Sequence, residues 1–231
     1  EDVLDLLNIL RAYKPKNSNS TIKLLEDVVL KMIMWLRSMT FEDGGVSCFN
    51  DSATNISAST CNILEYAKRL GFLNVKAQTT PDLFFRHLKD SGYISTKNNK
   101  FQLILDVAKL GPDHLLAHAH ADSLSFELSL GKQRVIVNSG TSCYGFSVRR
   151  AFERTTRAHN TVEINDVSSS EEWSSFRVAR RAYPTGLQIK NLQNNLSIKC
   201  SHTGYHWLLG SPKHTRSWLV DNKSIIIKDE V

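Results

Sequence analysis

The sequence predicts an α+β protein, in which a helical region is followed by an antiparallel β-sandwich or barrel. Apolar residues recur at helical spacing through the first ninety residues, and short apolar runs broken by turn residues follow. No helical pattern interrupts these runs, so we expect their strands to pair antiparallel. We place the boundary near residue 91, with a helical domain at 1–91 and a β-domain at 92–231.

Four helices are expected in the first domain. Thr21 is a capping residue for the second helix, whose apolar residues occupy more than one stripe, as in a helix packed on several sides. Gly71 ends the third helix, and Pro81 follows a capping residue at the start of the fourth. The expected helices cover about 3–13, 21–39, 58–70 and a stretch that begins at 80.

Ten short strands are expected beyond Gly92, where the apolar period changes from that of a helix to that of a strand. The turn at 130–133 separates two of them by so few residues that we expect a hairpin. The expected strands lie at 93–95, 101–107, 123–130, 134–137, 160–164, 174–181, 187–190, 196–201, 215–220 and 224–228.

Composition and charge narrow the class of protein. The chain has 231 residues, 41% of them hydrophobic, which is enough for a sizeable core, and a net charge of +6. The positive charge suits an anionic partner, and the absence of an arginine-rich arm or zinc-finger spacing argues against nucleic acid. No apolar run reaches the roughly 20 residues of a membrane span. Because the chain starts within an amphipathic pattern and ends on a strand-like run, we expect a fragment of a longer protein.

The sequence His118-Ala-His120-Ala-Asp122 is the first candidate site. As the start of a β-strand, it would place both imidazoles and the carboxylate on one face. Two imidazoles at this spacing can converge on a metal ion or a substrate, and an aspartate can orient one of them. The alternative is three solvated polar residues, but the small alanines and the apolar strand that follows favour a built site.

Further polar residues follow the same pair of strands. The expected hairpin would bring Asn138 toward the two histidines. Tyr144 lies in a glycine-containing turn, and Arg157 directly precedes a third candidate imidazole at His159. Each has a structural alternative, as a turn, packing or solvated residue. His202, His206 and His214 lack clustered partners in the sequence and are interpreted as surface or sheet histidines.

A second candidate segment is the loop at 43–53, which carries two glycines and several polar groups between two apolar helices. Binding groups concentrate on loops that a rigid scaffold presents, although a well-capped helix connection is an equal alternative. Asn50 in this loop and Asn160, next to His159, are our candidates for substrate binding together with Arg157.

Taken together, these segments resemble the heparinase II/III-like family of polysaccharide lyases. The resemblance rests on four motifs in order, and on the loop at 43–53 upstream of them. The motifs are His118-Ala-His120-Ala-Asp122-Ser-Leu-Ser-Phe, Val137-Asn138-Ser139-Gly140-Thr141, the arginine-rich stretch at 149–157, and His159-Asn160-Thr161-Val162.

The resemblance implies the C-terminal part of an (α/α) toroid followed by an antiparallel β-sandwich, with a substrate cleft. It also implies a structural Zn²⁺ bound by His120, Asn138 and His159, with His118 facing the cleft. Metal-binding members of the family carry an aspartate where this chain has Asn138. An amide oxygen brings no charge to offset the dication, so we expect zinc to be bound more weakly or not at all.

The activity implied is β-elimination beside a uronic acid in an acidic polysaccharide, in the periplasm or outside the cell. We assign His118 and Tyr144 as catalytic residues, with Tyr144 as the second candidate for the catalytic tyrosine, and Arg157 as a substrate contact. The tyrosines of the helical domain, Tyr13 and Tyr66, match no family motif, so the principal catalytic tyrosine is expected upstream of Glu1. The sequence does not predict the sugar cleaved or the oligomeric state.

Two other functions stay open at this point. Asn138 favours a relative that retains the cleft and binds glycans, or assists polysaccharide biosynthesis, without catalysis. A zinc hydrolase that uses the two histidines and the aspartate is the third reading, and it lacks further ligands at hydrolase spacing.

Overall fold

The computed structural model describes residues 1–72, 83–192 and 195–231, which form two compact units. The first unit contains the helices of the N-terminal part. The second contains the strands, and it also includes Ser47–Ala53, a segment that lies in sequence between two helices of the first unit. In the part of the chain that is described, no helix combines the length and the apolar character that a membrane crossing requires.

The helical unit consists of α1 (Asp2–Tyr13), α2 (Asn19–Met39) and α3 (Thr60–Arg69). Ser59 caps α3 by accepting a hydrogen bond from the amide of Asn62, at 3.2 Å. The three helices meet in a small apolar core of Leu4, Leu7, Val29, Ile33 and Ala67. Three helices are therefore confirmed where the sequence predicted them, with ends shifted by about two residues.

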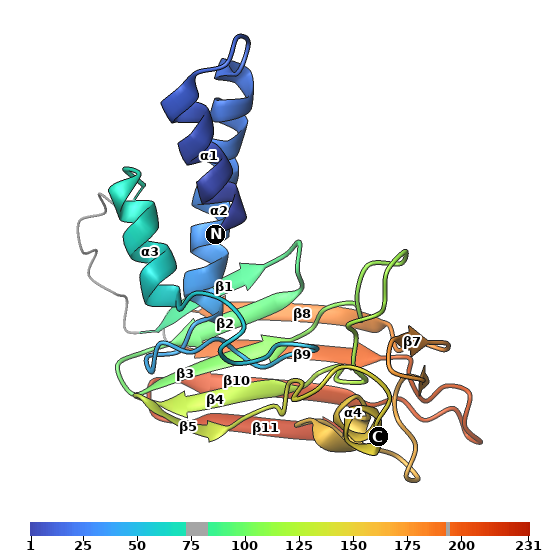
Figure 1. Ribbon diagram of the computed structural model, residues 1–231. Helices are drawn as coiled ribbons and strands as arrows, with labels where there is room; N and C mark the ends of the chain where they lie inside the picture. The colour runs from blue at the N-terminus through green and yellow to red at the C-terminus, as the bar shows by residue number, and fades with distance from the viewer. Residues whose placement is uncertain (73–82, 193–194) are drawn as a thin grey trace. The chain divides into compact units, whose positions relative to one another are not determined.

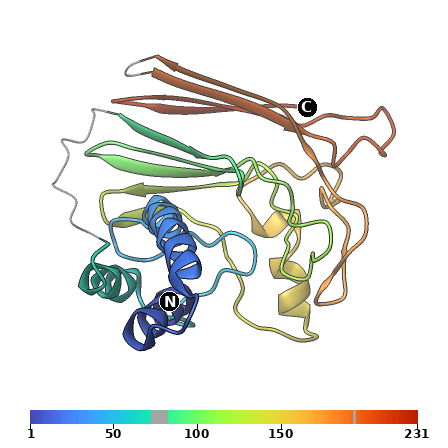
Figure 2. The same ribbon diagram turned by 90° about the horizontal axis from the view of Figure 1, so that it is seen from above.

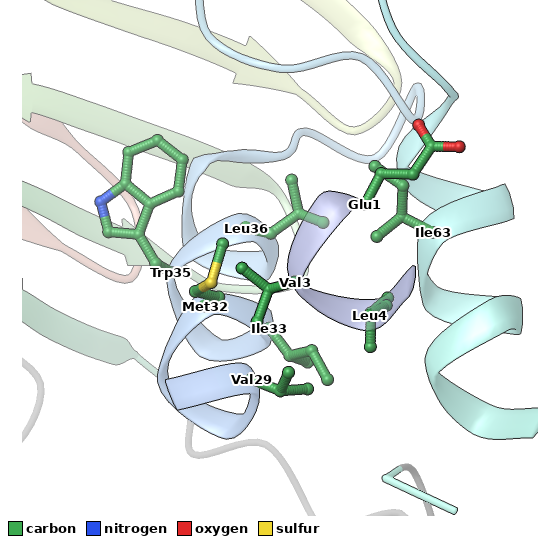
Figure 3. A pocket seen from close by; sticks show the side chains of 9 residues that line it. All are labelled: Glu1, Val3, Leu4, Val29, Met32, Ile33, Trp35, Leu36 and Ile63. Carbon is green, nitrogen blue, oxygen red and sulfur yellow. The ribbon is translucent and has the colours of Figure 1, made fainter. Parts of the chain in front are cut away.

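An apolar cavity of about 340 Å³ opens between these helices. Figure 3 shows its lining, with Val29, Met32 and Ile33 on α2 facing Leu4 on α1, and Ile63 on α3. Several large apolar side chains of α1 and α2 are exposed to solvent, and Met32 and Trp35 of the cavity lining are among them. The exposed side chains are Leu6, Ile9, Tyr13, Leu24, Leu30, Met32, Met34 and Trp35. The prediction that α2 packs on several sides is therefore met only in part by the described residues.

The β-unit is a sandwich of two antiparallel sheets. One sheet has the order β1-β2-β3-β4-β5 and the other β11-β10-β9-β8. Figures 1 and 2 show the two sheets stacked as layers. The strands are β1 (Phe84–Leu88), β2 (Tyr93–Lys97), β3 (Phe101–Asp106), β4 (Phe126–Leu130), β5 (Gln133–Ile136), β8 (Pro184–Leu192), β9 (Asn195–His202), β10 (Thr215–Asp221) and β11 (Ile225–Glu230).

The core of the sandwich lies between the sheets. Alternate residues of β3, such as Leu103 and Leu105, face Ile198 on β9 and Trp218 on β10, and all four are fully buried. This alternation is the period-2 pattern from which the strands were predicted. The described residues also include the short helix α4 (Val148–Glu153), a 3₁₀ turn η1 (Thr156–Ala158) and a two-stranded ribbon of β6 (Glu172–Trp173) and β7 (Arg177–Val178).

Three of the helices and strands expected at 80 and beyond are wrong, in addition to the strand start expected at 118–122. The residues expected to continue a fourth helix form β1, because Phe84–Leu88 pairs with Tyr93–Lys97 around a turn; the predicted start at 80–82 lies outside the described residues. Residues 160–164 form only a bridge from Ile164 to Val167, and most of 174–181 is irregular. In 160–164, hydrogen bonds from side chains replace a strand ladder.

Candidate active site

The segment Ser47–Ala53 reaches the sandwich beside the loop that follows β5. Thr141 donates its backbone N–H to the carbonyl of Ser52, at 3.0 Å. At Gly140, φ is +59°, and a Cβ atom there would lie 2.2 Å from the same carbonyl oxygen. Only glycine permits this approach of the two backbones. The contact places Asp51 inside the second unit.

Asp51 is the centre of the site. Its Oδ2 lies 2.9 Å from Nδ1 of His118, and its Oδ1 lies 2.7 Å from Nε2 of His120. Arg150 of α4 donates to both oxygens, with Nη2 2.7 Å from Oδ2. Burial alone would raise the pKa of Asp51, but hydrogen bonds from His120, Arg150 and His118 outweigh it and lower the pKa. The carboxylate is therefore ionised and bonded on both oxygens.

The two histidines differ in access to solvent. The side chain of His118 is 62% exposed, whereas that of His120 is fully buried and that of Asp51 is 5% exposed. His118 is therefore the member of this group that a ligand can reach. Both imidazoles contact one carboxylate, and their convergence on a metal ion or a substrate stays a prediction.

The strand predicted for the histidine motif is wrong. The two histidines meet on the carboxylate of Asp51, whereas the sequence suggested a metal ion or a substrate as their common partner. Residues 118–122 are irregular, and Arg154 satisfies much of their backbone. Its guanidinium donates to the carbonyl of Ala119 through Nε and Nη2, and its own carbonyl accepts from Ala121. Asp122 does not join the two histidines; it accepts from the amide of Asn50, at 3.3 Å, and burial raises its pKa to about 6.

Tyr144 lies beside His118. The two rings meet edge to face with centroids 6.3 Å apart, and the phenol ring stacks on Phe176 at 6.1 Å. The guanidinium of Arg150 lies 5.4 Å from the Tyr144 ring centre and 5.3 Å from that of Phe176. Arg150 thus binds Asp51 and also contacts the ring of Tyr144. The phenol of Tyr144 and the exposed imidazole of His118 form one accessible surface.

The residues predicted as metal ligands form a buried chain of contacts. Nδ1 of His120 lies 3.3 Å from Nε2 of His159, and Nδ1 of His159 lies 3.3 Å from Oδ1 of Asn138. Burial, followed by the neighbouring His120, lowers the pKa of His159 to about 3. Since the amide oxygen of Asn138 accepts from Nδ1 of His159, Nε2 of His159 carries a lone pair, which faces Nδ1 of His120.

This donor set fits a Zn²⁺ ion incompletely. The facing nitrogens of His120 and His159 could both bind one ion, but Asn138 contacts the opposite nitrogen of His159. Within the described ranges, no group of three His, Cys, Asp or Glu side chains could hold a metal. The structure therefore brings two imidazole nitrogens together, with Asn138 as the partner that orients one of them, and metal binding at this point stays a prediction.

The residues predicted to bind substrate are engaged with the protein. Asn50 accepts from the amide of His120 and donates to the hydroxyl of Tyr93, at 3.2 Å. Asn160 donates to two carbonyls at the ends of β4 and β5, at 3.0 and 2.8 Å. Arg157 is exposed and forms ion pairs with Glu163 and Asp166. Their contact with substrate stays a prediction.

A second histidine cluster lies at the end of β9 and β10. Nε2 of His202 lies 3.0 Å from Nδ1 of His214, whose Nε2 lies 2.7 Å from Asp229. Arg216 binds the same carboxylate through two nitrogens. Both histidines are buried and have partners, so their interpretation as residues without clustered partners is wrong. Their partner Asp229 lies on β11, and sequence spacing alone does not show that β10 and β11 align it with His214.

Two residues of the site were missed as functional candidates, Asp51 and Arg150. Both were within segments recognised as polar and motif-bearing, but a buried ion pair between residues 99 positions apart leaves no local periodic signal. The sequence feature that could have identified them is the charged residue type, because Asp51 and Arg150 both lie in segments that carry the family resemblance.

Comparison with known proteins agrees with this architecture. The sequence profile of the family described as "Heparinase II/III-like, C-terminal" matches residues 80–231. No curated protein sequence matches the chain. Among solved structures, a mutant of heparan sulfate lyase HepC from Pedobacter heparinus superimposes with a TM-score of 0.70 at 18% identity, over 99% of this chain and 36% of that one.

Two further structures have a similar fold. One described as heparinase III has a TM-score of 0.68 at 18% identity, over 98% of this chain and 38% of its own. A second heparinase III has a TM-score of 0.66 at 20% identity, over 90% of this chain and 32% of its own. The chain thus spans about a third of the length of these proteins. With two thirds of its residues inside the matched region, the chain belongs to the heparinase II/III-like family.

Proposed function

We propose that the protein is a lyase that cleaves an acidic, uronic-acid-containing polysaccharide by β-elimination. The observation that carries this proposal is the accessible His118–Tyr144 surface, supported from beneath by the buried Asp51–Arg150 pair. An exposed imidazole with one nitrogen bonded to a carboxylate has the other nitrogen available for proton transfer. The solved structures of similar fold include a heparan sulfate lyase, which supports the substrate class.

In this reaction a base removes the proton on the carbon next to the uronate carboxylate. The electron pair of that bond forms a carbon–carbon double bond, the glycosidic C–O bond breaks, and an acid protonates the departing oxygen. We assign proton transfer to Nε2 of His118 and to the hydroxyl of Tyr144, whose rings are in edge-to-face contact and whose side chains are both exposed. The net charge of +6 favours the approach of an anionic chain.

The helical unit is, in this proposal, part of an (α/α) toroid. Its three helices leave large apolar side chains uncovered on α1 and α2 and enclose an apolar cavity (Figure 3). Exposed apolar faces of this extent are typical of surfaces that pack against further elements. This chain covers only 36% of the HepC mutant, which also supports a helical unit that is one part of a larger helical domain.

A weak structural Zn²⁺ site at His120 and His159 is the accompanying proposal. Two facing imidazole nitrogens 3.3 Å apart and shielded from water suit a transition-metal ion. A bound ion would be held by both nitrogens in place of their direct contact. No proton transfer in the reaction depends on it.

The decisive experiment is an activity assay of the full-length protein on glycosaminoglycans, alginate and bacterial capsular polysaccharides. A lyase releases unsaturated uronides, which are detected by their ultraviolet absorbance and by mass spectrometry. His118→Gln should lower turnover by at least about 10²-fold while glycan binding remains. Glycan binding with no product from any polymer, unchanged by His118→Gln, would instead identify a binding protein.

A further inference from the structure

Asp51 is charged and buried, and the reaction proposed above does not require it to touch the substrate. Its carboxylate accepts from two imidazoles and from one guanidinium at the same time. A carboxylate that only joined a loop to α4 would need Arg150 alone. The additional bond to the exposed His118 is the feature that points to a role in the reaction.

The bond from His118 determines which ring nitrogen carries the proton. An ionised carboxylate only accepts hydrogen bonds, so Nδ1 of His118 must be the donor across the 2.9 Å contact. Nε2, on the opposite side of the ring, is then the nitrogen that can take a proton from substrate. An isolated neutral histidine favours the other tautomer, with its proton on Nε2, which could not act as a base at that atom.

The surroundings hold the carboxylate in one orientation. Arg150 binds both oxygens from within the protein and is itself fully buried. The amide of Asn50 is hydrogen-bonded to Asp122, which fixes the backbone immediately before Asp51. Bidentate arginine–carboxylate pairs restrict rotation of the carboxylate plane more than a single contact does. The Oδ2 atom is therefore aimed at His118 before any ligand arrives.

We propose that Asp51 is a positioning residue, which fixes His118 in the tautomer protonated at Nδ1 and keeps Nε2 available for the substrate. Arg150 has the supporting role of holding the carboxylate. The inference rests on the proposed function for its link to turnover, but the tautomer itself is a property of this chain that can be measured without substrate.

The first test is nitrogen-15 NMR of the unsubstituted protein, with labelled histidine rings, in mildly alkaline buffer. The chain has 8 histidines, and His118→Gln identifies the signals that belong to His118. We expect a protonated Nδ1 and a bare Nε2. A neutral ring with its proton on Nε2 would overturn the proposal, whatever the catalytic result.

The second test is Asp51→Asn in the full-length protein, with Asp229→Asn as the matched control. Asp229 also accepts from one imidazole and from two nitrogens of a guanidinium, that of Arg216, so its substitution removes the same kinds of contact at a side chain that is 30% exposed. We expect Asp51→Asn to lower kcat by about 10²-fold or more with KM changed by less than about threefold. Asp229→Asn should retain the His118 tautomer and most of kcat.

The His118 tautomer and the kcat of the two variants test the positioning role and the lyase activity separately. A protein without lyase activity whose His118 still has the expected tautomer contradicts the function and leaves the positioning intact. An active lyase in which Asp51→Asn and Asp229→Asn lower kcat equally, with the same His118 tautomer, contradicts the positioning role and leaves the function intact. If Asp51→Asn does not fold, the NMR measurement on the unsubstituted protein still decides.

Discussion

Nη2 of Arg150 lies 2.7 Å from Oδ2 of Asp51, and this contact joins residues that are 99 positions apart in the chain. Arg150 is fully buried and the Asp51 side chain is 5% exposed, so both charges have been removed from bulk water. Such a pair contributes little net stability, yet the loss of either partner leaves an uncompensated charge in the interior. The connection between Ser47–Ala53 and α4 depends on it.

Arg150→Met should therefore destabilise the protein strongly. We expect the free energy of unfolding to fall by about 3–5 kcal/mol, because Asp51 stays buried without its main cation. Urea unfolding followed by circular dichroism measures this change. Arg149→Met is the matched control, since its side chain is 74% exposed, and it should change stability by about 0.5 kcal/mol or less. Equal effects of the two substitutions would contradict this account of the buried pair.

Gly140→Ala should also destabilise the site, through the backbone. The new Cβ atom would lie 2.2 Å from the carbonyl oxygen of Ser52, at a φ of +59°. Strain of this kind costs about 1–3 kcal/mol, and relief requires the loops around 52 and 140 to separate. Gly145→Ala is the control, because φ is also positive there but the position is open. We expect lower thermal stability for Gly140→Ala than for Gly145→Ala by differential scanning calorimetry.

Glu172 gives the protein a pH-dependent stability. Its Oε1 is buried without a hydrogen-bond partner among the described residues, and burial raises the pKa of Glu172 from 4.5 to about 7. The folded state thus favours the protonated acid, so the contribution to stability is complete below pH 4.5 and is lost as the pH rises to about 7.

Glu172→Gln should remove this dependence, because the amide stays neutral at every pH. At pH 8 the variant should be more stable than the unsubstituted protein by up to about 3 kcal/mol, and at pH 4 the two should be nearly equal. Unfolding in urea at both pH values measures the difference. A variant that is less stable at pH 8 would show that Glu172 is held as a charged group.

Asn138→Asp should increase the affinity for Zn²⁺. Asn138 contacts His159 in the buried chain that leads to His120, and an aspartate would add the negative charge that the amide lacks. Even as an orienting partner, a carboxylate changes metal affinity by about 10- to 100-fold. Competition with a fluorescent zinc chelator measures the affinities, with His159→Gln as the variant that should lose binding. No zinc binding by either the parent or Asn138→Asp would contradict the proposed site.

Sequence patterns predicted the sandwich well, because its strands repeat apolar residues with period 2 and are separated by turns. They failed where side chains replace backbone pairing. Arg154 donates to the backbone carbonyl between His118 and His120, so this segment is not paired as a strand. Its alternating sequence therefore does not predict which way its side chains point. They also failed at Asp229, whose proximity to His214 depends on the register of β10 and β11. They did not predict that His118 and His120 share a carboxylate, because that carboxylate, Asp51, comes from a distant loop.

Tyr144→Phe tests the acid role of the phenol separately from its packing. The ring would still stack on Phe176 and cover Arg150, so we expect stability to change by about 1 kcal/mol or less. Without the hydroxyl, protonation of the departing oxygen loses its donor, and kcat on the polysaccharide should fall by about 10²-fold or more. Tyr183→Phe is the control, because Tyr183 is likewise partly exposed beside an arginine, Arg181, and should retain full activity. If Tyr144→Phe keeps full turnover on a substrate that His118→Gln cannot cleave, the acid must come from another residue, and Tyr144 is left with a packing role.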